Sequence, residues 1–501
     1  GLGVDDIESV EVLKDAASAA IYGSRGSNGV VLITSRRAQR GAPKLSAEAR
    51  VGLQGVEKRL DLLSASEWMR FRVKYNDANY LAKARMRGVT NAKVSDSADR
   101  RMKNVGGSIK RPDYTVVNDD RWFAYLEDDD RAAHAFAADA GPLSLLNWQD
   151  EAFRLAPVWS CGLSVSGGGG RSLYRVSGSF ESQDGVVVGT AFKRAALRSY
   201  LECGGVGGRW TLGLSLSPSL TLADNLGVAN GKDAMVHRIV ASVPVSESGV
   251  GYRTNVEPNA QYDWAGSQSS PTVALNTNKN RDQTVRLASK MSIVFRPSEA
   301  FKVEVVNAAE LVDADVAAYS FTSATSSWAH GEGSQSTGAH LTSRRWRTLS
   351  QVVADYARAV GPHSLTVMAG ASRERADEGY ATKQSFKNFA NDAVTGSFDG
   401  AVQTAVVNVV DEFTPAHLAS FFCRAGYVRA GRYAAMASLR YDGGSVFGQG
   451  DKWGAFPAIS AACWPKFFAR STPCTWASAA TSLRMVPMVS SGEQSLISTT
   501  S

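Results

Sequence analysis

Apolar and polar residues alternate over several long stretches of the chain. In residues 45–54 every odd-numbered position is apolar, and every even-numbered position is polar, charged or glycine. A similar period-two pattern occurs in residues 209–217, 285–295 and 432–442. Because successive side chains of a strand point to opposite faces of a sheet, this pattern predicts antiparallel strands with one apolar face.

The predicted strands are long, and the connections between them are of two kinds. Each strand runs for about ten residues, which is more than the usual ~5–6 and close to the ~9–11 that a tilted strand needs to cross a bilayer. Short turns are predicted at residues 166–171, 204–208, 296–300, 360–364 and 429–432. The other connections are long, polar and irregular, at residues 55–157, 221–282, 312–344 and 374–416, and only the one near 182–192 is short. Short turns at one end and long loops at the other are typical of an outer-membrane β-barrel. Period-two strands also build soluble sandwiches and propellers, so that alternative stays open.

The segment DAASAAIYGSRGSNGVVLIT, residues 15–34, places a glycine cluster between a short helical pattern and a strand pattern. No lysine follows the glycines in the register of a P-loop, and the order helix, glycines, strand is the reverse of a dinucleotide fingerprint. Glycines between two elements are ordinarily turn residues. We therefore interpret this segment as structural.

Composition narrows the function further. The chain has 501 residues and a formal net charge of +7, which is spread along its length and argues against nucleic-acid binding. The six histidines form no His-Glu-x-x-His motif, and none of the five cysteines forms a Cys-x-x-Cys motif; they are Cys161, Cys203, Cys423, Cys463 and Cys474. The sequence predicts no metal site, no cofactor and no catalytic site, so we do not expect an enzyme.

Residues 5–37 resemble the end of the plug domain of TonB-dependent outer-membrane receptors, and within them the SusC/RagA family. The signature positions that match are Asp15, Tyr22, Gly23, Ser24, Arg25, Gly26, Asn28 and Gly29, followed by Val30, Ile33 and Thr34. Residues 147–198 and 438–462 resemble stretches of the same family's barrel. The signature glycines suit tight turns in a confined lumen, and Arg25 suits a carboxylate on the inner wall. We interpret these residues as structural rather than as substrate contacts.

The resemblance implies an all-β, antiparallel transmembrane barrel that contains a plug. It implies import of oligosaccharides or peptides across the outer membrane of a Gram-negative, Bacteroidota-like cell. It further implies energy from the TonB–ExbB–ExbD system, contact with outer-membrane lipid and a SusD-like surface lipoprotein as partner. The alternative is a soluble β-rich binding or adhesion protein without a transport role.

The resemblance also predicts the domain organisation. Residues 1–40 are expected to be the C-terminal part of a plug, and residues 41–462 the N-terminal part of a barrel with long extracellular loops. We count about twelve strands, against 22 for a family barrel. The signal peptide, TonB box and first half of the plug are not found in the sequence. We therefore expect a partial chain, about half of a barrel, that does not transport by itself. In residues 463–501 the alternation stops, which suggests either a divergent end or an out-of-frame tail.

Three further features have alternative interpretations. The acidic run at residues 127–130 lacks the spacing of a calcium loop and is interpreted as a solvated loop. The tryptophans Trp159, Trp210 and Trp346 suit either an interfacial girdle or packing against the plug or loops. The loop aromatics Tyr252, Tyr262 and Trp264 suit either sugar stacking or support of the loop itself.

Overall fold

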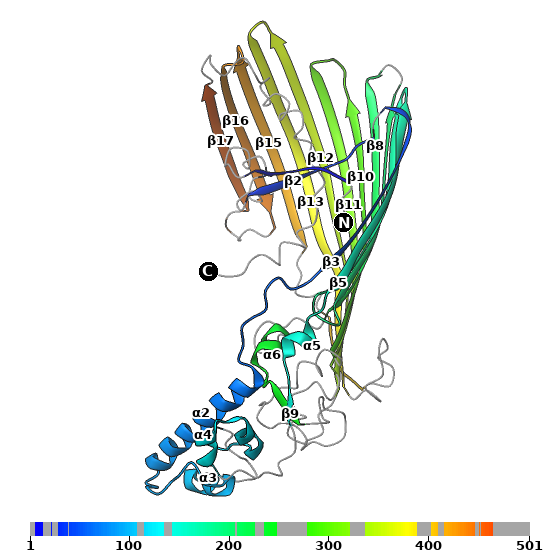
Figure 1. Ribbon diagram of the computed structural model, residues 1–501. Coiled ribbons are helices and arrows are strands. Elements are labelled where there is room, and N and C mark those ends of the chain that lie inside the picture. The colour runs from blue at the N-terminus through cyan, green and yellow to red at the C-terminus, as the bar shows by residue number, and fades with distance from the viewer. Residues whose placement is uncertain are drawn as a thin grey trace.

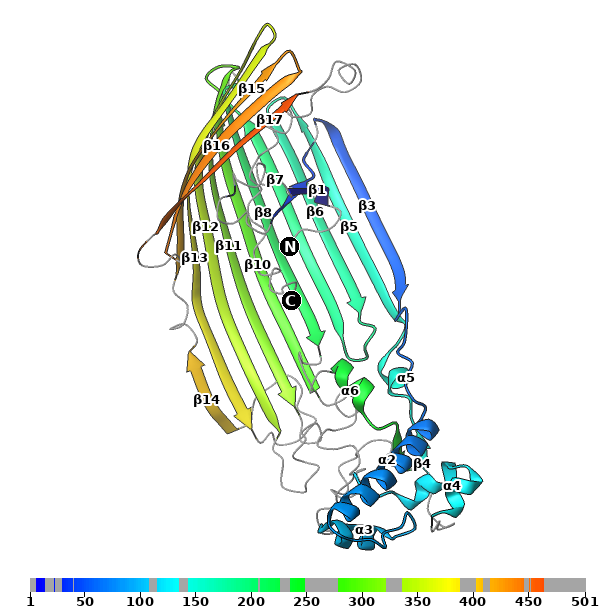
Figure 2. The same cartoon turned by 90° about the vertical axis from the view of Figure 1, so that its left-hand side faces the viewer.

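One curved antiparallel sheet dominates the structure (Figure 1). The computed structural model describes residues 6–13, 22, 29–38, 40–107, 115–134, 143–205, 208–225, 235–247, 278–320, 336–387, 402–408, 415–445, 450 and 452–463. A small hairpin lies on the concave side of the sheet, and a mostly helical lobe stands at one end of it (Figures 1 and 2).

The sheet contains 13 strands. Along its main path every strand pairs with the next described long strand of the chain, in the order β3 (Gly41–Gln54), β5 (Ala156–Gly169), β6 (Ser172–Asp184), β7 (Ala191–Gly204), β8 (Trp210–Asn225), β10 (Asn278–Phe295), β11 (Phe301–Ser320), β12 (Thr337–Val360), β13 (His363–Lys387), β15 (Ala416–Arg429), β16 (Tyr433–Gly444) and β17 (Trp453–Cys463). The remaining strand, β14 (Val402–Asn408), pairs with β13 alone. The predicted all-β class and the predicted antiparallel barrel wall are confirmed.

The two ends of the sheet differ as predicted. The short turns after β5, β7, β10, β12 and β15 lie together at the end opposite the lobe, which we call the turn rim (Figure 2). The lobe lies at the opposite end, the loop rim, where the other ends of these strands also lie. This sorting follows from antiparallel pairing of consecutive strands, because every second connection returns to the same edge.

The two faces of the sheet have different chemistry. On the convex face, the outer wall, apolar side chains form continuous rows across the strands; Leu214, for example, faces Leu201 on one side and Met291 on the other. Half of the Leu214 surface is exposed, at 50%. The concave face, the inner wall, carries polar and charged side chains such as Ser177 and Arg198. An apolar outer wall and a polar inner wall are the arrangement of a barrel whose outside meets lipid.

Aromatic residues gather on the outer wall at two levels. Near the loop rim, Trp159 lies 5.0 Å from Phe180 and Tyr441 lies 5.0 Å from Trp453, measured between ring centroids, and Trp346 lies on the same face. Near the turn rim, Trp210 stacks on Phe295 at 4.2 Å. We call these two groups the loop-side belt and the turn-side belt. Of the two interpretations of Trp159, Trp210 and Trp346, the structure favours the interfacial girdle, because all three are exposed on the outer wall.

The separation of the belts suits a bilayer. On β12, Trp346 belongs to the loop-side belt and Tyr356 to the turn-side belt. Tyr356 pairs with Phe301 of β11. Ten residues at about 3.3 Å each, tilted by about 45°, span roughly 23 Å, close to the ~25 Å apolar band of outer-membrane barrels.

Three strands extend well past the loop-side belt, which corrects the prediction of irregular loops at residues 312–344 and 374–416. β11 continues to Ser320, β12 begins at Thr337, and β13 continues to Lys387. Beyond Trp346 the outer wall carries ion pairs such as Asp313 with Arg344, at 2.6 Å. Where both faces of a sheet meet water, the backbone stays extended but the apolar alternation disappears, so the sequence pattern no longer marks the strand.

The connection at residues 55–157 is also not irregular. Its described residues form α2 (Ala65–Met86), α3 (Ala98–Val105), η3 (Asp120–Tyr125), α4 (Asp128–Ala132), β4 (Leu143–Leu145) and α5 (Trp148–Ala152). The connection after β8 adds α6 (Met235–Ala241) and β9 (Val245–Glu247). β4 pairs with β9, and Trp148 Nε1 donates to the Val243 carbonyl at 2.9 Å, so two connections far apart in sequence form one lobe. None of the described helices has the length and apolar character that a bilayer crossing requires.

Helix α2 organises this lobe. It begins at a capping box, in which the side chain of Ser64 accepts from the Glu67 backbone and the Glu67 side chain accepts from the Ser64 backbone. The Ser64 hydroxyl donates to the Glu67 carboxylate at 2.6 Å, and this bond, together with the bond from the Ser64 backbone N–H, lowers the pKa of Glu67. One face of α2 packs Met69 and Val73 against Trp122 and its neighbours, and further along it packs Tyr80 against Met102 and its neighbours.

Candidate functional site

The N-terminal hairpin lies inside the curve of the sheet, where a plug is expected (Figures 1 and 2). It consists of β1 (Ile7–Leu13) and β2 (Val30–Ser35), which pair antiparallel. Most of GVVLIT is therefore a strand, as predicted. β1 and β2 form a sheet of their own, which is separate from the large sheet.

Polar contacts hold the hairpin against β6 and β7. Ser177 Oγ donates to the Asp6 carboxylate at 2.7 Å, and Arg198 Nη2 donates to Ser35 Oγ at 2.5 Å. Arg175 Nη2 lies 3.5 Å from the same Asp6 carboxylate. Asp6 and Ser177 are both buried. The start of β1 and the end of β2 are thus tied to the inner wall by hydrogen bonds and charge.

The hairpin has internal ties at the same point. The Arg36 backbone N–H donates to the Asp6 carbonyl at 2.8 Å, and the Arg36 side chain donates to the Ile7 carbonyl at 3.2 Å. Asp6 therefore joins three segments: β1 through its own chain, β2 through Arg36, and the inner wall through Ser177. No sequence signal singled out Asp6, because it lies within the stretch that resembles a plug but before the signature positions, which begin at Asp15.

Of the eight signature positions from Asp15 to Gly29, two belong to the described residues. Gly29 has φ +86°, a left-handed conformation that glycine adopts without strain, directly before β2. Tyr22 lies within electrostatic reach of the Arg424 guanidinium on β15. The other six, Asp15, Gly23, Ser24, Arg25, Gly26 and Asn28, lie outside the described residues, and their roles stay predictions.

The inner wall carries ion pairs between neighbouring positions. The pairs are Arg194 with Glu181, Arg286 with Glu310, Lys302 with Asp355 and Arg440 with Asp442. Arg440 and Asp442 are almost completely buried, and Arg440 also donates to Ser420 Oγ at 2.7 Å. They form the Arg-x-Asp of the stretch 438–462 that supports the resemblance. Paired charges give the concave face the polar character of the interior of an outer-membrane barrel.

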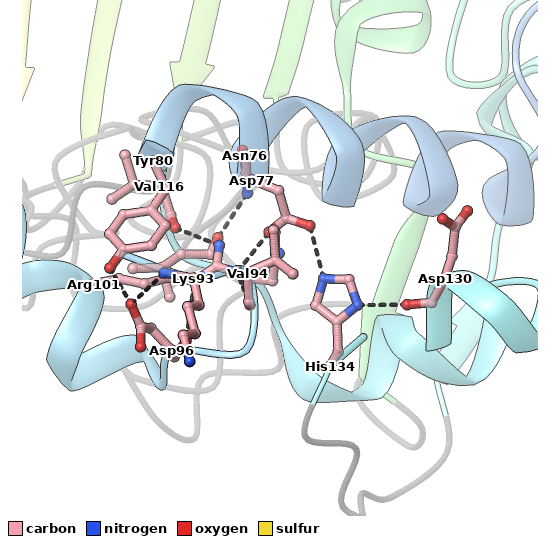
Figure 3. A network of polar contacts seen from close by, with 12 residues as sticks. Asn76, Asp77, Tyr80, Lys93, Val94, Asp96, Arg101, Val116, Asp130 and His134 are labelled. Carbon is pink, nitrogen blue, oxygen red and sulfur yellow. Dashed lines mark hydrogen bonds and ion pairs between the residues drawn. The ribbon is translucent and has the colours of Figure 1, made fainter. Parts of the chain in front are cut away.

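The lobe contains a buried polar network (Figure 3). The Asp77 carboxylate on α2 accepts from Arg101 at 2.6 Å, from Asn118 at 2.9 Å and from His134 Nε2 at 2.7 Å. Arg101 also donates to the Val116 carbonyl, at 3.0 Å. The network therefore joins α2, α3, the segment before η3 and the residue that follows α4 by two positions.

His134 is held in its charged form by this geometry. One ring nitrogen faces the Asp77 carboxylate, and the other lies 2.7 Å from the Asp130 carbonyl oxygen (Figure 3). Because both partners only accept hydrogen bonds, both nitrogens must donate, which requires the imidazolium. Burial by itself lowers the pKa of His134, but the hydrogen bonds to Asp77 and Asp130 outweigh it and the pKa is raised.

The acidic run at 127–130 is solvated, as predicted, but it is the start of a helix and not a loop. Asp128 begins α4, Asp130 pairs with Lys74 on α2 at 2.9 Å, and its carbonyl accepts from His134. Acidic residues suit the first turn of a helix because of the helix dipole. In the described part of the chain no cluster of three His, Cys, Asp or Glu side chains suits a metal. Tyr252, Tyr262 and Trp264 lie outside the described residues.

Comparison with known proteins finds relatives along most of the chain. No protein-family profile matches it. It is 24% identical over 470 residues to "TonB-dependent receptor P3" of Formosa agariphila, and 22% identical over 488 residues to "TonB-dependent receptor SusC" of Bacteroides thetaiotaomicron. These alignments cover 90% and 91% of the chain but 39% and 40% of the relatives, so the chain spans about two-fifths of the length of the curated relatives it matches.

Solved structures show the same fold. The chain superposes with a TM-score of 0.67 on a structure titled "Structure of the RagAB peptide transporter", at 18% identity over 91% of this chain and 48% of that one. A second, "Structure of the RagAB peptide importer in the 'open-open' state", gives a TM-score of 0.68 at 16% identity, over 94% of this chain and 49% of that one. Sequence relatives and fold therefore confirm the resemblance that the motifs predicted, to TonB-dependent receptors of the SusC/RagA family.

Proposed function

We propose that the chain is the plug-bearing part of an outer-membrane receptor that imports large nutrients. The observation that supports this most directly is the β1–β2 hairpin, seated by Asp6 and Arg198 inside a curved sheet whose outer wall is apolar and belted by aromatic residues. A segment fixed by polar contacts inside a barrel can block the lumen at rest and still be displaced. The loop rim would face outward and the turn rim the periplasm.

The proposed cargo is an oligosaccharide or a peptide, and the proposed partners are a SusD-like surface lipoprotein at the loop rim and the TonB–ExbB–ExbD system. Similarity to SusC and to the RagAB peptide importer supports these proposals. The lobe of α2 to α6 gives the loop rim a folded surface on which a lipoprotein would sit. The chemistry is transport, and we propose no catalytic role.

The experiment is deletion of the gene and growth on single nutrients. The mutant should fail to grow on one class, defined oligosaccharides or defined peptides, while growth on free monosaccharides and amino acids is unchanged. Complementation with the whole receptor should restore growth only in a strain with functional TonB. Growth equal to the parent on every polymer would overturn the import function.

Cell fractionation separates this proposal from the alternative, a soluble β-rich binding or adhesion protein. That protein would need to bury its apolar faces between two sheets, whereas Leu212 and Leu214 are about half exposed on the outer wall. The receptor should be recovered from outer membranes only with detergent. Recovery in the detergent-free soluble fraction would favour the alternative.

A further inference from the structure

A shallow groove crosses the outer wall over β5 to β8. It has a volume of about 620 Å³ and an apolar lining. It exists because small and large side chains alternate along two rows that cross β5, β6 and β7. In one row Gly178 lies between Leu163 and Leu197. In the next row Phe180 lies between Cys161 and Ala195. The small residues form the floor and the large ones the sides.

The groove lies in the lipid-facing band, close to the loop-side belt. Phe180 lines it and is also in contact with Trp159 of that belt. If the loop rim faces outward, the groove opens on the acyl chains of the outer leaflet. Its occupant is then a lipid, because at this depth the outer wall meets hydrocarbon.

A cation stands at the end of the groove nearest the loop rim. Lys193 is exposed on the outer wall, two residues along β7 from Ala195, and it faces Ser182, which in turn faces Trp159. Among the described residues, no carboxylate forms an ion pair with Lys193; the nearby pair Arg281 with Asp224 is already made. A lysine at the membrane interface extends its ammonium toward the headgroups.

We propose that this surface binds a phosphate-bearing lipid of the outer leaflet, with one acyl chain in the groove and the phosphate on Lys193. Apolar contact by itself gives little selectivity in a bilayer, since every lipid chain is equally apolar. The pairing of Lys193 with the headgroup selects an anionic lipid, and the shape of the groove fixes its chain. This site is independent of the imported cargo.

The test uses the whole receptor, purified from outer membranes and placed in phosphatidylcholine nanodiscs. The probe is a trace of phosphatidylglycerol that carries a diazirine on one acyl chain, and the comparison is phosphatidylcholine with the same chain. After irradiation, labelled peptides are mapped by mass spectrometry. Labelling should concentrate several-fold on residues 161–163 and 178–197, relative to the outer wall of β16, and should favour the anionic probe.

Two variants separate the parts of the site. Gly178→Leu fills the floor and should reduce the groove labelling several-fold; a Cβ added at this position meets only Leu197 Cδ1, at 4.0 Å. Lys193→Gln should remove the preference for the anionic probe. The control Ala437→Leu enlarges a side chain on the outer wall of β16 and should change nothing. Even labelling along the outer wall, or groove labelling unchanged by Gly178→Leu, would overturn the acyl-chain site; an unchanged preference in Lys193→Gln would overturn the phosphate contact.

Discussion

The carboxylate of Asp6 accepts a hydrogen bond of 2.7 Å from Ser177, a residue 171 positions later in the chain. This contact joins the hairpin inside the sheet to the wall that surrounds it. Arg175 adds positive charge beside the same carboxylate, so the contact is a charge-assisted one. Movement of β1 away from β6 must break it.

Asp6→Ala should loosen the hairpin in the whole receptor. A hydrogen bond to a charged group contributes about 1.5–3 kcal/mol, and its loss also leaves Arg175 without this carboxylate. Amide hydrogen exchange of β1 and β2 should therefore become at least several-fold faster. Asp6→Asn keeps an acceptor for Ser177 and should show a smaller effect, and Glu8→Ala, at an exposed position of β1, should show none. Equal exchange in Asp6→Ala and in the unchanged receptor would contradict the role of this contact.

The two faces of β8 should respond oppositely to a charge. Leu214→Arg places a guanidinium on the outer wall between the belts, which costs about 2–4 kcal/mol near the bilayer midplane. Ser215→Arg, the next residue, places the same group on the inner wall. When the whole receptor is refolded into vesicles, Leu214→Arg should lose the folded, heat-modifiable band on gels. Ser215→Arg should keep this band. Similar loss in both would argue against the assigned faces.

Arg101 should be essential to the lobe. Its guanidinium is buried against Asp77, and its loss breaks a buried ion pair and leaves His134 as the remaining cation beside this carboxylate. Breaking a buried ion pair typically costs about 3–5 kcal/mol. Arg101→Leu should expose α2 and α3 to limited proteolysis. Arg100→Ala is the matched control, because the Arg100 side chain is exposed and its pair with Asp96 leaves the Asp77 network untouched. Both variants should keep the heat-modifiable barrel.

The lobe should lose stability as the pH rises. The pKa of His134 is raised in the folded lobe, so its stabilisation is fully present below the ordinary histidine pKa of about 6.5 and is lost as the pH rises through the folded value. The charged groups around the ring are Asp77, with Arg101 behind it, and the Asp130–Lys74 pair on α4 and α2.

The measurement is amide hydrogen exchange of α2 between about pH 6 and pH 9, after correction for the intrinsic rate. Protection of α2 should decrease across this range. In His134→Gln the decrease should be absent, because glutamine does not titrate, while His363→Gln at the turn rim should behave like the unchanged receptor. A pH-independent protection in the unchanged receptor would show that His134 does not need its proton.

Sequence pattern was informative wherever lipid faces one side of a strand. The alternation in residues 45–54, 209–217, 285–295 and 432–442 marked β3, β8, β10 and β16 because the bilayer requires apolar residues at every second position. It failed for the ends of β11, β12 and β13, where Asp313 and Arg344 stand on the outer wall in water. The strands continue there, but no lipid faces them, so nothing requires an apolar residue at every second position.

The lobe was missed for a different reason. Ser64 and Glu67 formed a recognisable capping box, which is a sequence signal for a helix start. The buried face of α2, however, includes the polar residues Asn76 and Asp77 between Met69 and Tyr80, so it does not read as an apolar stripe. Those two positions are tolerated inside because Arg101, Asn118 and His134 satisfy Asp77, and these partners come from segments that no local pattern connects to α2.

The sequence by itself determined the strands, their two faces, the sorting of turns and loops and the resemblance of the N-terminal segment to a plug, because each depends on local spacing or on a contiguous motif. Only the tertiary structure decided that Asp6 meets Ser177, that Asp77, Arg101 and His134 share one buried network, and that Lys193 stands above a groove floored by Gly178. These relationships depend on the register between strands and on the meeting of distant segments. The strand register and the contacts between distant segments are set by the packing of the whole sheet. They cannot be predicted from the residues next to each position in the chain.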